Sequence, residues 1–267
     1  NGLWALIDQA LADPKFSEDA SHRAKVLKSL RERIRNAPLD PDFESKLSNA
    51  LIPLASRGER GLFVRSSTNA EDLPGFNGAG LYDTVPNVKG AEELSAAVRR
   101  VWASVWNLRA YEERQYFGID HREVYGALLI QIGINATAAG VLVTTNIFDP
   151  EEDESYTINA KSGLGMRVVQ GKRVPEQLIF DTTNMGIKVL SRSAEDTMLV
   201  FDEKGGVKEV VNPDKGMPIL SDARVTQLGM AAKEIKELFG WKEPVDIEWL
   251  FEEHELFLVQ ALPYVGN

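Results

Sequence analysis

The spacing of apolar residues changes along the chain, and this change limits the folds that the chain can adopt. In the first sixty residues, apolar side chains recur three or four positions apart, as they do on one face of a helix. The two clearest stripes are Leu3, Leu6, Ile7 and Leu11, and then Val26, Leu27, Leu30 and Ile34. From Tyr125 onward, short apolar runs between Gly, Asp and Pro predict strands instead. The pattern therefore predicts a chain of mixed helices and strands.

Several individual elements follow from this spacing. Residues 61–66 predict a short buried strand, and residues 91–116 predict one long helix in which Trp102 and Trp106 pack in the core. A second marked helix is capped by Ser221 and ends at Gly240; its apolar face comprises Val225, Leu228, Ala232, Ile235 and Phe239. Further strands are predicted over 127–132, 140–145, 156–160 and 177–180, with a hairpin over 245–250 and 256–260.

Composition excludes several classes of function. The 267 residues carry a net charge of −10, which argues against binding to nucleic acids or anionic membranes because both require a basic face. The chain has no cysteine, so it has no disulfide and no thiolate chemistry, and this fits a reducing cytoplasm. No apolar run approaches the roughly 18 residues that span a bilayer. Because the chain lacks an initiator Met, we expect it to be an internal fragment of a longer protein.

The first candidate site is the segment 65–73 with the small-residue loop 74–80 that follows it. Arg65 comes at the end of a predicted strand, Ser66 and other hydroxyls follow, and Gly78 and Gly80 close the loop. A guanidinium offers a planar fork of donors, and glycine lets the backbone approach phosphate oxygens closely. The segment could also be an ordinary turn in which Glu71 pairs with Arg65.

The second candidate site is the pair Asp246 and Glu248 on the first strand of the predicted hairpin. Residues two apart in a strand point to the same face, so both carboxylates project together, and Gln260 lies on the neighbouring strand. Magnesium prefers such oxygen ligands, usually one or two carboxylates together with substrate phosphates. The alternative is a solvated acidic edge.

Taken together, these segments resemble the ATP-binding domain of the family that includes phosphoenolpyruvate synthase, pyruvate phosphate dikinase, rifampin phosphotransferase and glucan, water dikinase. The stretch 65–73 resembles the Arg-Ser-Ser-x-x-x-Glu-Asp-Leu signature of this family. Further matches run in order over about three quarters of the chain: 102–104, 118–121, 140–142, 149–150, 163–165, 168–171, 246–249 and 260–263.

The resemblance implies an α+β chain with an ATP-grasp fold of two lobes. The N-terminal lobe, 1–130, would be incomplete and would carry the phosphate loop, and the C-terminal lobe, 131–267, would carry the metal site. The predicted nucleotide-binding residues are Arg65, Ser66, Gly78, Gly80, Gln131, Lys161 and Arg167. Of these, Arg65 would be catalytic and contact the phosphates, and Gln131 would belong to the linker that meets the adenine. Asp246, Glu248 and Gln260 would surround Mg²⁺.

The family converts ATP to AMP and passes the β-phosphoryl group to a histidine and then to an acceptor. The histidine belongs to a separate swivelling domain outside this chain, so the resemblance implies that domain and an acceptor domain as partners. His121 falls in a matched segment, but we expect it to serve in capping or packing. The acceptor stays open between pyruvate, glucan, water and another hydroxyl compound.

Three departures from the family pattern stand against a simple transfer of function. Met166 replaces the glutamate of Gly-Leu-Gly-Glu, and Leu262 replaces the arginine of Gln-x-Arg-Pro. The lysine-containing Gly-Gly-Lys segment of the family has no counterpart here. Lys161, Arg167 or Lys172 could supply the positive charge that leucine cannot. The alternatives are therefore a nucleotide-binding module without catalysis, which would be regulatory or serve in assembly, or a scaffold that binds no nucleotide.

Overall fold

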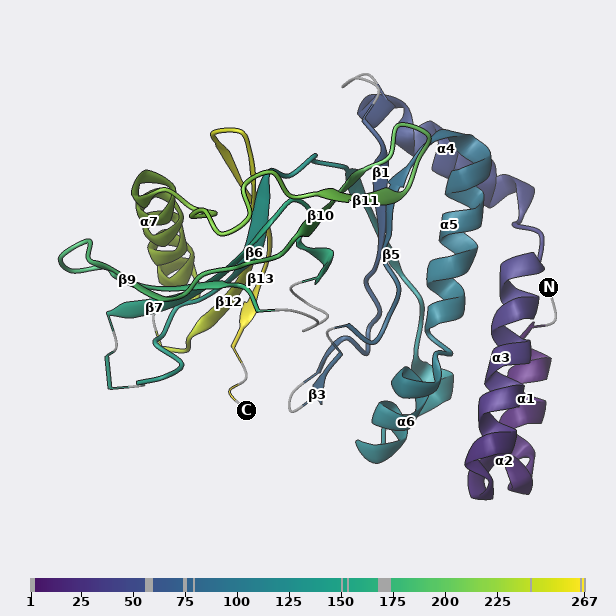
Figure 1. Cartoon of the computed structure of the whole chain (residues 1–267). Helices are drawn as coiled ribbons and strands as arrows, with labels where there is room; N and C mark the ends of the chain where they lie inside the picture. Colours follow the sequence, from purple (N-terminus) through teal and green to yellow (C-terminus); the bar gives the residue numbers. More distant parts are fainter. Residues whose placement is uncertain are drawn as a thin grey trace. The chain divides into compact units, whose positions relative to one another are not determined.

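The computed structural model of the chain describes residues 3–55, 60–73, 76–78, 80–149, 151–152, 154–167, 174–240, 242–264 and 266. Both halves of the described chain combine helices with sheets, so the fold is α+β (Figure 1). The chain divides into two compact units. Unit 1 comprises Asn1–Gly133 and Asp202–Gly206, and unit 2 comprises Ile134–Phe201 and Val207–Asn267. The assignment of two ATP-grasp lobes, 1–130 and 131–267, stays a prediction.

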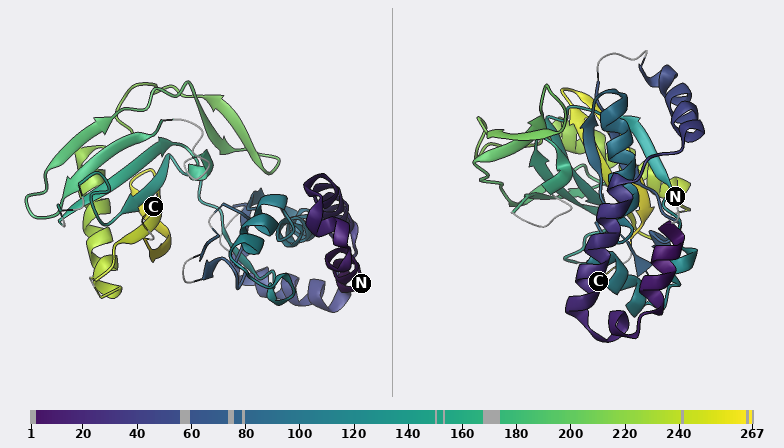
Figure 2. Two further views of the ribbon diagram at one scale, coloured as in Figure 1. Left: turned by 90° about the horizontal axis from the view of Figure 1, so that it is seen from below. Right: turned by 90° about the vertical axis from the view of Figure 1, so that its right-hand side faces the viewer.

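Unit 1 begins with the helices that the apolar spacing predicts. They are α1 (Leu3–Ala12), α2 (Pro14–Glu18), α3 (Ala20–Asn36) and α4 (Pro41–Ala55). Asp13 and Asp19 cap α2 and α3, because their carboxylates accept hydrogen bonds from the first free backbone amides of each helix. Ile7, Phe16 and Leu27 are buried where α1, α2 and α3 pack together (Figure 2).

The prediction of one helix over 91–116 is wrong. The structure has two helices here, α5 (Gly90–Ser104) and α6 (Leu108–Tyr116). Between them the Val105 carbonyl accepts a hydrogen bond from Arg114 Nη2 at 2.7 Å, and the Trp106 carbonyl accepts one from Arg31 Nη1 at 2.9 Å. Side chains from other turns thus satisfy carbonyls that a continuous helix would bond internally. The expected core packing is confirmed, since Trp106 is buried and Trp102 packs beside it.

A three-stranded antiparallel sheet completes unit 1, in the order β4-β1-β5. The strands are β1 (Leu62–Ser66), β4 (Val85–Val88) and β5 (Leu128–Ile132). Helix α5 packs on one face of this sheet, where Val64 and Val88 meet Leu94, Val98 and Val101 (Figure 1). A small hairpin, β2 (Asp72–Leu73) and β3 (Phe76–Asn77), follows β1.

Unit 2 is built on a six-stranded antiparallel sheet in the order β13-β12-β6-β7-β8-β9. The strands are β6 (Ala138–Val143), β7 (Ser155–Ser162), β8 (Glu176–Asp181), β9 (Ile187–Ser191), β12 (Val245–Glu252) and β13 (Glu255–Pro263). The predicted strands 140–145, 156–160 and 177–180 and the terminal hairpin are confirmed, with no end displaced by more than three residues. Strand β9 has no counterpart among the predictions.

Helix α7 (Asp222–Leu238) covers one face of this sheet (Figure 1). As predicted, Ser221 caps it, by accepting a hydrogen bond from the Arg224 amide at 3.4 Å, and Gly240 follows its end with a positive φ of 81°. The prediction that Phe239 lines the apolar face is wrong, because this side chain is 43% exposed. Val225, Leu228 and Ala232 are buried against the sheet and Ile235 packs beside them, so the apolar face ends at Ile235 and the last turn of α7 leaves the core.

A second hairpin, β10 (Thr197–Phe201) and β11 (Val207–Val211), packs on the opposite face of the sheet from α7 (Figure 2). Leu199, Phe201 and Val207 of this hairpin pack with Ala139 and Leu164 of unit 2. No helix within the described parts of the chain is long and apolar enough to cross a lipid bilayer.

Candidate functional site

In unit 1, two predicted nucleotide-binding residues share one face of the sheet. Strand register pairs Arg65 with Leu129 and Phe63 with Gln131. The residues between them, such as Val64, point to the core under α5, so Arg65 and Gln131 lie on the opposite face. Leu129, on that same face, is 47% exposed. The sheet therefore brings Arg65 and Gln131 together on a face that α5 does not cover.

The turn after β1 is held by side chains of its own. The Ser66 hydroxyl donates to Glu71 Oε1 at 3.2 Å, and the Thr68 amide donates to Glu71 Oε2 at 3.2 Å. The Ala70 amide donates to Thr68 Oγ1 at 3.2 Å. Ser66 can therefore donate to a phosphate oxygen only after it exchanges its bond to Glu71.

The predicted phosphate loop, 74–80, follows β2 and contains β3. The Gly78 amide donates to the Glu71 carbonyl at 2.8 Å, and a Cβ at Gly78 would lie 2.8 Å from that oxygen. Only glycine fits this approach without a shift of the backbone. Gly80 is exposed and has a positive φ of 72°, which also favours glycine. Pro74, Gly75 and Ala79 of the predicted loop lie outside the described residues.

In unit 2, the predicted metal residues meet on one face of the sheet. Residues of β12 are alternately buried and half-buried, with Ile247 and Trp249 facing α7 and Asp246 and Glu248 facing away. Gln260 on β13 lies directly opposite Glu248. Because β12 pairs with β13 on one side and with β6 on the other, the two carboxylates are not on an edge strand. Val245, Ile247 and Trp249 face the core, as the alternative interpretation also expects, so a solvated acidic surface stays the alternative to a metal site.

The Asp246 carboxylate is held in unfavourable surroundings. Its Oδ1 is buried and accepts no hydrogen bond from any residue that the structure describes. Burial, and secondly the negative charge of Glu248, raise the pKa of Asp246 to about 6. Its cross-strand neighbour on β13 is Leu262, whose side chain has no hydrogen-bond donor. A buried carboxylate oxygen without a donor is the kind of group that a cation would satisfy.

These residues fit a magnesium ion that also binds phosphates. Within the described ranges, no group of three or more His, Cys, Asp or Glu is placed to hold a metal ion. Asp246, Glu248 and Gln260 offer two carboxylates and one amide oxygen, and Mg²⁺ commonly takes one or two carboxylates and completes its shell with water and substrate phosphates. The donor set therefore suits a magnesium ion that arrives with a nucleotide better than a permanent metal centre.

Two further polar residues of this sheet face were not predicted. Strand register places Gln260, Glu248, Val141, Asn159 and Gln177 in one row across five strands. Gln177 Nε2 donates to Asn159 Oδ1 at 2.9 Å. The alternation of Tyr156, Ile158 and Ala160 with polar residues could have identified Asn159, because it places Asn159 opposite the core face.

Lys161 lies on the same face as Asn159 but is already engaged. Its ammonium group donates to Glu195 Oε1 at 3.0 Å, and the two side chains are only 2% and 8% exposed. Lys161 would have to leave this internal ion pair to contact a phosphate. Arg167 ends the short 3₁₀ helix η2 (Gly165–Arg167), but its side chain, Lys172 and the matched segment 168–171 lie outside the described residues.

His121 has the packing role that the sequence predicts. It is buried, stacks on Tyr111 with ring centres 4.1 Å apart, and accepts a hydrogen bond at Nδ1 from Arg114 Nε at 3.3 Å. That donor leaves the proton on Nε2, which donates to Gln115 Oε1 at 3.1 Å. Burial, and secondly the charge of Arg114, lower the pKa of His121 to about 4, so the ring is neutral at neutral pH.

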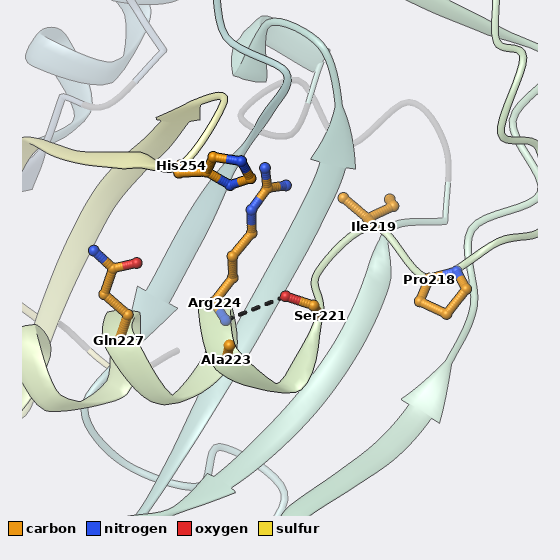
Figure 3. Close-up of a pocket in the computed structure, with 7 residues that line it drawn as sticks. All are labelled: Pro218, Ile219, Ser221, Ala223, Arg224, Gln227 and His254. Atoms are coloured by element: carbon orange, nitrogen blue, oxygen red, sulfur yellow. Dashed lines mark hydrogen bonds between the residues drawn. The ribbon is translucent and has the colours of Figure 1, made fainter.

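A surface cavity of about 440 Å³ lies elsewhere in unit 2 (Figure 3). Pro218 and Ser221, the first turns of α7 with Arg224, and His254 of the β12–β13 turn line it. Arg224 reaches across to the Glu253 carbonyl. None of the predicted site residues lines this cavity, so it is separate from the acidic sheet face.

The chain is thus an α+β protein in which each unit carries a sheet with one helix-covered face and, on the other face, side chains predicted to bind a ligand. The family model described as "Pyruvate phosphate dikinase, AMP/ATP-binding domain" matches residues 1–265. The chain belongs to this family, as the sequence motifs predict.

Named relatives agree with this assignment. The chain is 34% identical over 250 residues to a "Probable phosphoenolpyruvate synthase" of Methanocaldococcus jannaschii, a match covering 92% of this chain and 21% of that protein. It is 29% identical over 259 residues to the "Phosphoenolpyruvate synthase" of Pyrococcus furiosus, covering 92% and 31%. A "Rifampicin phosphotransferase" of Streptomyces is 33% identical over 250 residues, covering 90% and 28%. The chain therefore spans about a fifth to a third of the length of these relatives.

Proposed function

We propose that the chain binds Mg-ATP and acts as the nucleotide-binding part of a dikinase related to phosphoenolpyruvate synthase. The observation that carries the proposal is the acidic sheet face of unit 2, in a chain whose family is named for AMP and ATP binding. There, Asp246 has a buried oxygen without a donor, next to Glu248 and opposite the strand that carries Gln260.

The residues of this chain would act mainly by position and charge. Mg²⁺, when bound, would neutralise charge on the phosphates, and Asp246, Glu248 and Gln260 would hold it. Arg65 would supply a fixed positive charge to the phosphate oxygens, and Gln131, on the same sheet face, would lie toward the adenine. Phosphoryl transfer relies on such positioning and charge neutralisation. The two-lobed ATP-grasp fold belongs to this proposal.

The remaining steps require domains outside the chain. We infer that the β-phosphoryl group passes to a histidine on a swivelling domain and then to an acceptor on another domain. Two of the three histidines here are already engaged within the fold, since His121 is buried and neutral and His22 pairs with Asp13 at 2.8 Å. A cytoplasmic location is proposed on the absence of cysteine.

A second function, a nucleotide-binding module without catalysis, is favoured by one specific observation. Leu262 lies directly opposite Asp246, at the position where the sequence pattern of the family has an arginine. A leucine there cannot offer Asp246 or a bound phosphate the positive charge that an arginine at this position would supply. Phosphoryl transfer by the longer parent protein would exclude a module without catalysis, whereas ATP binding without phosphoryl transfer would establish it.

The proposal is tested by calorimetric titration with ATP of the chain and of Glu248→Gln, each with and without Mg²⁺. Because Glu248 is proposed as a magnesium ligand, the substitution should weaken ATP binding with Mg²⁺ present and change it much less without Mg²⁺. Glu252→Gln is a matched control, since Glu252 lies on the same strand and the same face four residues along. An equal loss with and without the metal would mean that Glu248 is structural.

A further inference from the structure

The turn between β1 and β2 is tied to a distant segment of unit 1 by one asparagine side chain. Asn69 Nδ2 donates to the Glu123 carbonyl at 2.8 Å, and Asn69 Oδ1 accepts from the Tyr125 amide at 2.8 Å. A backbone bond from the Ser67 amide to the Ala127 carbonyl, 3.0 Å long, lies beside them. The turn is therefore joined to residues 123–127 by three hydrogen bonds, two of which depend on the Asn69 amide.

These bonds continue the pairing of two strands past the point where the strands end. The β1–β5 ladder closes with Ser66 opposite Leu128, and Ser67 adds one more backbone bond. Beyond it the chain turns away, and the amide group of Asn69 replaces the backbone donor and acceptor that a longer strand would offer. An asparagine side chain suits this use because it carries both a donor and an acceptor.

The segment that receives these bonds is itself well anchored. Asp120 caps the short 3₁₀ helix η1 (His121–Glu123) by accepting from the Arg122 amide at 2.9 Å, and His121 is fixed by its ring stacking and its two hydrogen bonds. The Glu123 carbonyl is at the end of this anchored helix. Asn69 thus fastens the turn to a rigid support.

We propose that Asn69 is a positioning residue that holds the β1–β2 turn for phosphate binding. The turn follows Arg65 and contains the Thr68 amide and the Glu71 carboxylate that organise Ser66. Asn69 fixes this turn against the segment that leads into β5, the strand that carries Gln131. This inference rests on the proposed function, because it assigns Asn69 to the phosphate end of the same nucleotide site.

Different hydrogen bonds hold strand β1 and the β1–β2 turn, so the loss of the Asn69 side chain should affect the turn and not the strand. Arg65 lies within the five-residue ladder between β1 and β5, so the loss of Asn69 should leave its backbone in place. The turn at 68–71 depends on the Asn69 bonds and should loosen. Binding of the triphosphate should then weaken, while binding of the adenosine part should not.

The test compares the chain with Asn69→Ala by titration with Mg-ATP and, separately, with adenosine. Loss of two hydrogen bonds that order the turn should raise the dissociation constant for Mg-ATP about fivefold or more and that for adenosine less than twofold. Asn184→Ala is the matched control, because Asn184 is also exposed and, among the residues that the structure describes, its side chain bonds within its own turn, to Asp181 and Gly186. Hydrogen exchange at the Tyr125 amide should quicken in Asn69→Ala alone.

The possible results distinguish a failure of the Asn69 inference from a failure of the proposed function. A chain that binds Mg-ATP, with Asn69→Ala binding it equally well, would overturn the inference and leave the proposed function standing. An equal loss for Mg-ATP and adenosine would overturn it too, by showing a merely structural role. If neither the unchanged chain nor its longer parent bound either ligand, the proposed function would fail and the inference with it.

Discussion

Replacement of Asp246 by asparagine should make the chain more stable while removing a proposed magnesium ligand. Burial and the neighbouring charge of Glu248 raise the pKa of Asp246 from 3.8 to about 6. The folded state therefore holds this proton more tightly than the unfolded state does. The contribution of Asp246 to stability is greatest below the pKa that this residue has in the unfolded chain. It is lost as the pH rises from about 4 to about 6, where the folded protein must ionise a carboxyl group in surroundings that disfavour its charge.

The size of the effect follows from the shift. A change of about two pKa units corresponds to roughly 3 kcal/mol at most. Asp246 is only partly buried, so solvent screening reduces this, and we expect Asp246→Asn to raise the free energy of unfolding by about 1–2 kcal/mol at about pH 7.5. Below about pH 4 the wild-type carboxyl is protonated in both states, and the gain should disappear.

Urea unfolding without Mg²⁺, at both pH values, measures this directly. Asp214→Asn is the control, because Asp214 is an exposed aspartate in the same unit and its replacement should change stability little at either pH. If Asp246→Asn were less stable than the wild type at neutral pH, or if its gain were the same at both pH values, the buried oxygen of Asp246 would not be the strained group described here.

Three further predictions concern other parts of the chain. Arg65→Ala should weaken Mg-ATP binding by about 1.5–3 kcal/mol by calorimetry, because a charge-assisted phosphate contact is lost, and an unchanged affinity would remove Arg65 from the site. Asn87→Ala should lower the free energy of unfolding by about 1–3 kcal/mol. Asn87 is buried, has a positive φ of 51°, and donates hydrogen bonds to the Asp202 and Gly206 carbonyls, both at 2.7 Å. Denaturant unfolding that matches the wild type would contradict this. Leu262→Arg should stabilise the metal-free chain at neutral pH by placing a positive charge opposite Asp246, and a loss of stability in the same assay would show that the arginine cannot reach the carboxylate.

Local patterns predicted much of the fold because each depends on neighbouring residues. The alternation along β12 gave both its core face and the shared face of Asp246 and Glu248. The interruption between α5 and α6 could not be predicted in the same way, since it depends on Arg31, which lies some seventy residues earlier in the chain. Strands β10 and β11 were missed because they are only partly buried and lack a clear alternation of polar and apolar residues.

In the candidate site, too, local patterns predicted some features, whereas others depend on residues far away in the chain. Motif and strand period identified Arg65 and the acidic pair, whose positions follow from two short strands. The burial of Lys161 depends on Glu195, 34 residues away in the chain, and no local pattern signals that ion pair. The unpartnered oxygen of Asp246 likewise follows from strand register, which sets Leu262 opposite it.

We propose above that this chain holds Mg-ATP through the acidic face of unit 2. Calorimetric titration of the unchanged chain with ATP, with and without Mg²⁺, tests it most directly. The affinity for ATP should increase clearly when Mg²⁺ is present. If ATP bound equally well with and without Mg²⁺, or if neither this chain nor its longer parent bound ATP in either condition, the acidic face would not be a Mg-ATP site.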